Sequence, residues 1–81
     1  MQVTIRLFAR LRDIAGTPEL ARDVPAGATV EALWQQTAAE FPQMRPYRSS
    51  ISVAVNAEYA RFTQVLAAGD EVVFLPPVSG G

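Results

Sequence analysis

The chain has 81 residues, of which 49% are hydrophobic and 19% are charged, and its formal net charge at neutral pH is −1. This length supports one domain, and the apolar content suits a compact core and not a disordered segment. The chain has no cysteine and no histidine, which excludes disulfides, thiol nucleophiles, imidazole bases and the usual zinc or iron ligand sets, and with them most enzyme chemistry.

All seven basic side chains are arginines, scattered among eight acidic residues. Nucleic-acid binding is not expected, because it normally needs a basic patch that neutralises phosphates. The lack of lysine also excludes Schiff-base chemistry and acylation of the chain's own side chains. No apolar run approaches membrane-spanning length, and Arg6 and Asp13 make the N-terminal segment atypical of a signal or transit peptide. We expect a cytoplasmic protein without membrane association or a metal site.

The N-terminal third predicts two paired strands. Residues 3–9 alternate between apolar and polar side chains, as in a half-buried strand, although Phe8 falls on the polar face. Residues 10–16 predict a helical turn that ends at Gly16, a natural left-handed cap. A short strand is expected over residues 19–24, and it should pair antiparallel with the first strand.

The segment "ATVEALWQQTAAEFPQ" predicts the main helix. Thr29 is a good N-cap residue, an acidic residue follows in the first turn, and Pro42 ends the helix. The apolar residues follow one helical face, so we interpret Trp34 and Phe41 as core residues and not as groups that stack on a ligand.

The segment "PQMRPYRSS" is expected to be a loop before a hairpin. The hairpin has a strand through Val55, a turn at Asn56 and Ala57, and a return strand over residues 58–60. Ala57 stands where such turns prefer glycine. A positive φ would cost an alanine about 1 kcal/mol, so a different type of turn is also open.

A last strand is expected over residues 71–75, and Pro76 and Pro77 stop it because proline has no N–H for a ladder. With a single long helix that needs one sheet to cover it, the order of elements predicts an α+β roll, a mixed five-stranded sheet over one main helix. We expect a domain over residues 1–75, an extended tail over residues 76–81, and one open sheet face.

The open face is expected to carry apolar side chains. The charge of Glu71 indicates that its side of the last strand is open, which would expose Val73 and Leu75. If the first and last strands are neighbours, Phe8 joins these two residues, and Tyr59 on the short strand extends the patch. We interpret the patch as a partner-binding surface, and the alternative is a satellite core under a flanking loop.

The chain ends in "FLPPVSGG". One interpretation is a frayed terminus or a linker. In the functional interpretation, Pro76 and Pro77 favour a stiff, extended exit, and Gly80 and Gly81 have no Cβ to clash in a narrow channel. Such a tail can deliver its carboxylate into another protein's active site. Since no side chain offers cysteine, lysine or histidine chemistry, the α-carboxylate of Gly81 is the best remaining reactive group.

The chain resembles the ubiquitin-like β-grasp sulfur carriers, specifically the molybdopterin synthase small-subunit family. The resemblance covers the whole length, through "LFARLRDIAG", "ATVEALW", "VAVN" and, most specifically, "GDEVVFLPPVSGG". The departure from the family pattern is Ala57, where glycine is common, and it leaves the tail unaffected.

This resemblance implies a β-grasp fold with a flexible Gly-Gly tail, in a subunit that donates sulfur but is not catalytic alone. An ATP-dependent activating enzyme would adenylate Gly81, and a persulfide from a sulfur-donor protein would convert it into a thiocarboxylate. That group would give its sulfur to precursor Z (cyclic pyranopterin monophosphate), in the synthesis of the molybdopterin dithiolene for the molybdenum cofactor. The activating enzyme would use the ATP, and no bound cofactor is expected.

The resemblance also implies a complex of two small with two large synthase subunits. Gly80 would let Gly81 thread into the large subunit, whose groove would hold Pro76, Pro77, Val78 and Ser79. Phe8, Tyr59 and Leu75 match positions that make apolar contacts with that subunit in the family. The alternatives are a carrier for thiamin thiazole synthesis, a protein-modifying ubiquitin-like relative, and an interaction module with an inert tail.

Overall fold

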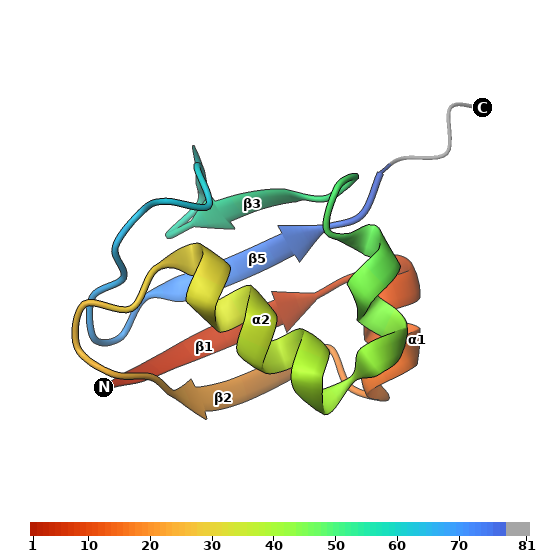
Figure 1. Cartoon of the computed structure of the whole chain (residues 1–81), viewed down its shortest axis with the longest axis horizontal. Coiled ribbons are helices and arrows are strands. Elements are labelled where there is room, and N and C mark those ends of the chain that lie inside the picture. Colours follow the sequence, from red (N-terminus) through yellow and green to blue (C-terminus); the bar gives the residue numbers. More distant parts are fainter. Residues whose placement is uncertain (78–81) are drawn as a thin grey trace.

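The computed structural model describes residues 1–77, which form one mixed five-stranded sheet packed against helices (Figure 1). The elements in chain order are β1 Gln2–Leu7, α1 Ala9–Ala15, β2 Glu19–Asp23, α2 Val30–Glu40, the 3₁₀ helix η1 Pro42–Tyr47, β3 Ser52–Val55, β4 Glu58–Ala60 and β5 Glu71–Leu75. The strand order is β2-β1-β5-β3-β4, with β1 and β5 parallel and every other neighbouring pair antiparallel. The expected α+β class and the antiparallel pairing of the first two strands are confirmed.

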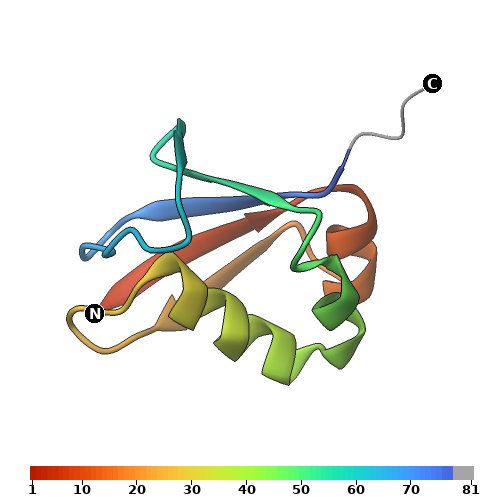
Figure 2. The ribbon, with the colours of Figure 1, turned by 45° about the horizontal axis from the view of Figure 1, so that its top comes forward.

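The core lies between the sheet and α2. Figure 2 shows α2 and η1 on one side of the sheet, and within residues 1–77 no helix covers the other side. The alternating residues Val3, Ile5 and Leu7 of β1 are buried, as the sequence pattern predicts. Trp34 of α2 packs edge-on against Phe74 of β5, with 5.0 Å between the ring centroids. The interpretation of Trp34 as a core residue is confirmed.

The predicted ends of α2 are confirmed. The Thr29 hydroxyl accepts a hydrogen bond from the backbone N–H of Ala32 at 3.2 Å, which satisfies one of the unpaired donors of the first turn. The helix ends at Glu40, two residues before Pro42. Phe41 follows the last turn and packs, half-buried, against the core, so it too belongs to the core.

The expectation of a loop after α2 is wrong, because this segment forms η1. Pro42 begins the 3₁₀ helix. Proline is tolerated there because the backbone N–H of a first helical residue has no partner within the helix. The short helix places Met44 in the core, where its side chain is fully buried. Burial of this one apolar residue in a polar segment rich in proline gives no periodic pattern, which is why the sequence pattern misses η1.

The hairpin between β3 and β4 is as predicted, and its turn uses two positive φ angles. Val55 pairs with Glu58, which leaves Asn56 and Ala57 as the turn, with φ of 51° and 70°. Positive φ at both central residues is typical of a type I′ turn, so the other turn type that the sequence left open does not occur. The Asn56 side chain ties the turn to the start of β5, because its Oδ1 accepts from the N–H of Glu71 at 3.0 Å.

Replacing Ala57 with glycine should stabilise the domain by about 0.5–1 kcal/mol, because glycine adopts a positive φ without the steric cost that alanine carries. Urea denaturation measures the change. The matched control is Ala32→Gly in α2, which should destabilise the domain by roughly 0.5–1 kcal/mol. A destabilised Ala57→Gly variant would contradict the turn geometry.

Candidate functional site

The strand register brings four open-face positions into one row across the sheet. Arg6 of β1 lies beside Val73 of β5, Val73 lies beside Ala54 of β3, and Ala54 lies beside Tyr59 of β4. Side chains alternate along each strand, so these four point away from the face that packs on α2. The row therefore changes from charged at β1 to apolar at β5, β3 and β4.

Apolar side chains gather on this face around the end of β5. Phe8 is 44% exposed and Tyr59 is 82% exposed, while Val73 and Leu75 are half-buried. We call Phe8, Tyr59, Val73 and Leu75 the open-face patch. Within residues 1–77 no flanking loop covers Phe8 or Tyr59, so the alternative of a closed satellite core does not describe them. Their role as a partner surface stays a prediction.

The position of Phe8 follows from the turn between β1 and α1. The backbone of Phe8 is still extended, with φ of −130° and ψ of 159°, so its side chain stays on the same face as Arg6. The next residue, Ala9, has φ of 49° and turns the chain into α1. Because Leu7 pairs with Phe74, Phe8 lies level with Leu75 at the end of β5.

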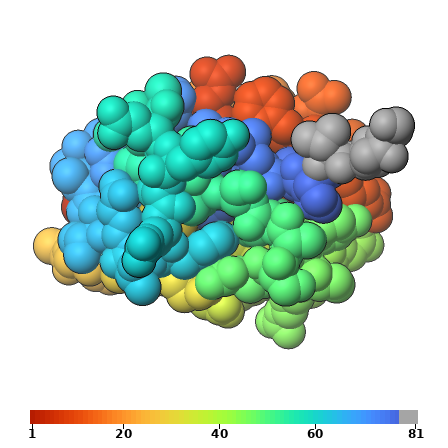
Figure 3. Space-filling view, turned by 90° about the horizontal axis from the view of Figure 1, so that it is seen from above, coloured from red at the N-terminus to blue at the C-terminus, as the bar shows by residue number. Residues whose placement is uncertain are grey.

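The chain leaves the sheet at the border of the open-face patch. Figure 1 shows α1 and the end of β5 at the same end of the molecule, away from the N-terminus. In Figure 3 the blue atoms at the end of β5 reach the surface between red atoms of the β1–α1 segment and green atoms of the region of η1. Pro76 is half-buried and Pro77 is exposed. The other predicted tail residues, Val78, Ser79, Gly80 and Gly81, lie outside the described residues.

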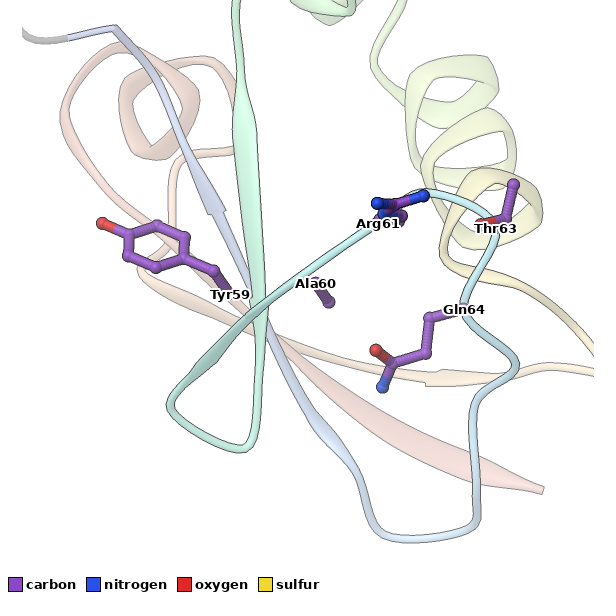
Figure 4. A pocket seen from close by; sticks show the side chains of 5 residues that line it. All are labelled: Tyr59, Ala60, Arg61, Thr63 and Gln64. Carbon is purple, nitrogen blue, oxygen red and sulfur yellow. The ribbon is translucent and has the colours of Figure 1, made fainter.

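A shallow hollow of about 500 Å³ lies beside β4. Its lining residues are Tyr59, Ala60, Arg61, Thr63 and Gln64. Figure 4 shows the Tyr59 ring on the other side of β4 from Gln64. The lining includes one cation, Arg61, and no carboxylate that could act as a general base. Among residues 1–77 there is also no cluster of acidic residues suited to a metal ion. No helix in that range is long and apolar enough to cross a membrane.

One ion pair joins the segment after η1 to the start of α2, and sequence patterns gave no sign of it. The Arg48 guanidinium donates to the Glu31 carboxylate, with 3.0 Å from Nε to Oε1 and 2.6 Å from Nη2 to Oε1. The same guanidinium lies 3.5 Å above the ring of Phe62. Hydrogen bonds from Arg48 hold the pKa of Glu31 below its ordinary value. These contacts fix the segment after β4, the strand that carries Tyr59.

The lowered pKa of Glu31 predicts an acid-dependent loss of stability. The charged form is favoured in the fold, so its contribution is present above the unfolded pKa of about 4.3 and is lost as the pH falls through the lower folded pKa. Glu31→Gln should therefore cost about 0.3–1 kcal/mol at neutral pH, the range for an exposed ion pair, and progressively less below about pH 4.

Urea denaturation of both proteins between neutral pH and pH ~3 measures this difference. Glu58→Gln, at an exposed position in β4, is the control and should show a difference that does not depend on pH in this way. A Glu31→Gln deficit that stays constant down to the most acidic point would contradict the role of the ion pair.

Comparison with known proteins places these features in a family. The model of the ThiS family matches residues 5–81. The chain is 39% identical over 83 residues to the molybdopterin synthase sulfur carrier subunit of Escherichia coli, an alignment that covers 98% of this chain and 99% of that protein. It is 32% identical over 81 residues to the protein of the same name from Arabidopsis thaliana, with 100% of this chain and 84% of that protein covered.

A solved structure has the same fold. The crystal structure of small archaeal modifier protein 1 (SAMP1) from Haloferax volcanii superposes with a TM-score of 0.88 at 32% sequence identity. The superposition covers 100% of both chains. The expected β-grasp arrangement of sheet and helix is thereby confirmed.

Proposed function

The chain belongs to the ThiS family, and from that premise we propose that it is the sulfur-carrier small subunit of a molybdopterin synthase. This membership confirms the resemblance that the sequence motifs indicate. The observation that carries the proposal is similarity along the whole chain to sulfur carrier subunits of that synthase from a bacterium and a plant. The exit of the chain beside an exposed apolar patch supports it, because a carrier must present its end to other proteins.

The proposed chemistry needs only one group of this chain, the carboxylate of Gly81. A carboxylate is a poor electrophile, so an activating enzyme would use ATP to form an acyl-adenylate at Gly81, with release of pyrophosphate. A persulfide sulfur from a donor protein would attack this carbonyl carbon and displace AMP. Reductive cleavage of the S–S bond by a thiol would leave a thiocarboxylate. Since the chain has no cysteine, it has to obtain its sulfur from another protein.

The thiocarboxylate would then be used inside the large subunit of the synthase. Its sulfur attacks precursor Z, and hydrolysis of the resulting thioester returns the carboxylate of Gly81. Two such deliveries complete the dithiolene, which later holds molybdenum in the finished cofactor. The acid, base and phosphate-binding groups would belong to the large subunit, which fits the lack of a paired nucleophile and base in the described residues.

The open-face patch is the proposed contact with the large subunit. Burial of Phe8 and Tyr59 in a complex would stabilise it by removing apolar surface from water, and the adjoining Arg6 and Glu71 give the rim a polar edge. Pro76 to Ser79 would lie in the groove of the large subunit, with Gly80 and Gly81 at its active site. We propose the two-plus-two assembly and a cytoplasmic location on the same grounds.

A second candidate function is protein modification, which the similarity to SAMP1 favours. The same Gly81 adenylate would then pass to an amine of a target protein. A carrier for thiamin thiazole synthesis would also use this chemistry with another acceptor. An inert interaction module differs from all three, because its Gly81 would not be adenylated.

Appending one alanine after Gly81 should abolish sulfur transfer in a reconstituted synthase, because the adenylate and the thiocarboxylate have to form on the terminal glycine. The fold should be unaffected, since the last strand ends at Leu75, six residues before Gly81. The control is one alanine placed before Met1, which should leave transfer intact. Conversion of precursor Z measures activity, and undiminished conversion by the C-terminally extended chain would refute the mechanism.

Replacing Phe8 with aspartate should weaken binding of the large subunit by about tenfold or more, because a charge would be buried against an apolar surface. Phe8 is 44% exposed in this structure, so the domain should still fold. The matched control is Val65→Asp, at a 60% exposed apolar position outside the open-face patch. Titration calorimetry measures binding. Equal affinities of the two variants, or a Phe8→Asp chain that melts at room temperature, would contradict the assignment.

A further inference from the structure

All cationic side chains in this protein are non-nucleophilic. The seven basic residues are arginines, and lysine is absent from the 81 residues. A guanidinium stays protonated at any physiological pH, whereas a lysine amine has a measurable neutral fraction that attacks activated acyl groups. The only amine of the chain is therefore the amino group of Met1. In the proposed function the carboxylate of Gly81 is converted into an acylating group, which would react with any amine within its reach.

The exit of the tail is flanked by one of these arginines. Leu7 pairs with Phe74, so α1, which starts two residues after Leu7, begins beside the end of β5. Arg10 is the second residue of α1 and is exposed. Four residues follow Pro77, and a chain of that length spans at most about 14 Å. A lysine at position 10 would thus lie within reach of an activated Gly81.

The Met1 amino group lies at the opposite end of the sheet. It donates to the carbonyl oxygen of Val24 at 2.7 Å. The six residues of β1 lie between the Met1 amino group and the end of the sheet where β5 finishes. At roughly 3.3 Å per residue, this distance is about 20 Å. Figure 1 shows the N-terminus and the end of β5 at opposite ends of the molecule. This distance exceeds the span of about 14 Å that the four residues after Pro77 can cover.

We infer that the chain is a one-way acyl donor: because its basic side chains are all arginines, Arg10 above all, an activated Gly81 has no side-chain amine of its own chain to acylate. The inference rests on the proposed function, because only an activated Gly81 makes this protection relevant. The excluded reaction is attack of an amine nitrogen on the Gly81 carbonyl carbon. An N–C bond would form, the C–O bond to AMP would break, and the amine would lose a proton, which traps the carrier as an internal amide.

The same composition limits reaction between copies. A second molecule offers another activated chain only its Met1 amino group, which is hydrogen-bonded to Val24. Acyl transfer is thereby directed to nucleophiles that a partner supplies, whether a persulfide or an amine of a target protein. The absence of lysine from this chain thus contributes to specificity for the acceptor.

The test uses the full-length chain prepared with Gly81 as a thioester of a small thiol, in mildly alkaline buffer, without any activating enzyme. Arg10→Lys should lose its thioester at least about tenfold faster than the unaltered chain, because an amine near the tail acts at a high effective concentration. Its product should have the mass of the free acid less one water, with the new amide located at position 10. The rate should not change on dilution.

The matched control is Arg22→Lys, which places an amine on β2 opposite Val3, at the N-terminal end of β1. This chain and the unaltered one should only hydrolyse. The inference is overturned if Arg10→Lys hydrolyses at the unaltered rate without forming the amide, or if the unaltered chain acylates its own Met1. Failure of an activating enzyme to adenylate Gly81 would refute the proposed function separately, since the thioester assay does not use that enzyme.

Discussion

The parallel pairing of β1 with β5 is the constraint on which the candidate site depends. These two strands are the centre of the sheet, and their register places Leu7 opposite Phe74. Since both strands run in the same direction, the chain leaves β5 at the end where β1 turns into α1. An antiparallel pair would release the tail at the Met1 end. The pairing therefore brings the open-face patch and the start of the tail together.

The two faces of the sheet differ in burial: one packs on α2 and the other is open. One face buries Ile5, Val72 and Phe74 in the core, where Phe74 packs against Trp34, and burial of each such side chain is worth roughly 1.5–3 kcal/mol. On the other face of the sheet, Phe8 is 44% exposed and Tyr59 of the edge strand β4 is 82% exposed, so these two side chains contribute less to the stability of the free domain. A domain of this size has little apolar surface to spare, so large exposed side chains at the tail exit are better explained by a partner than by folding.

In the proposed mechanism, the chemistry of this chain is concentrated in Gly81. Without cysteine and lysine, the side chains include no thiol or amine that would compete for an activated Gly81, and without histidine they include no imidazole base. In the proposed function, the folded domain is the origin of the tail and a surface for docking. Recognition and catalysis would then be divided between this chain and the proteins proposed to activate, load and unload it.

Much of this arrangement follows from local sequence patterns. The alternation in β1 and the apolar face with its Thr29 cap in α2 identify both elements, because one side of each is buried. The exposed apolar residues were also predicted from strand parity, but only on the condition that the first and last strands are neighbours. Pairing between strands more than sixty residues apart has no local signal, and the structure supplies it.

The features that sequence patterns missed depend on single long-range contacts. Burial of Met44 makes η1 a helix in a segment that contains two prolines. The Asn56 side chain, bonded to the start of β5, accompanies the positive φ of Ala57 in the turn. The Arg48 contacts with Glu31 and Phe62 join residues with no regular spacing. The roles of Val78, Ser79, Gly80 and Gly81 remain proposals drawn from the sequence and the family.

The most direct test of the account is the intact mass of the protein after incubation with its activating enzyme, ATP and a sulfur source. The account predicts a mass gain equal to the exchange of one oxygen for one sulfur, located at Gly81 by fragmentation. An unchanged mass, with an activating enzyme that loads a control carrier in the same reaction, would contradict the proposal that this chain carries sulfur.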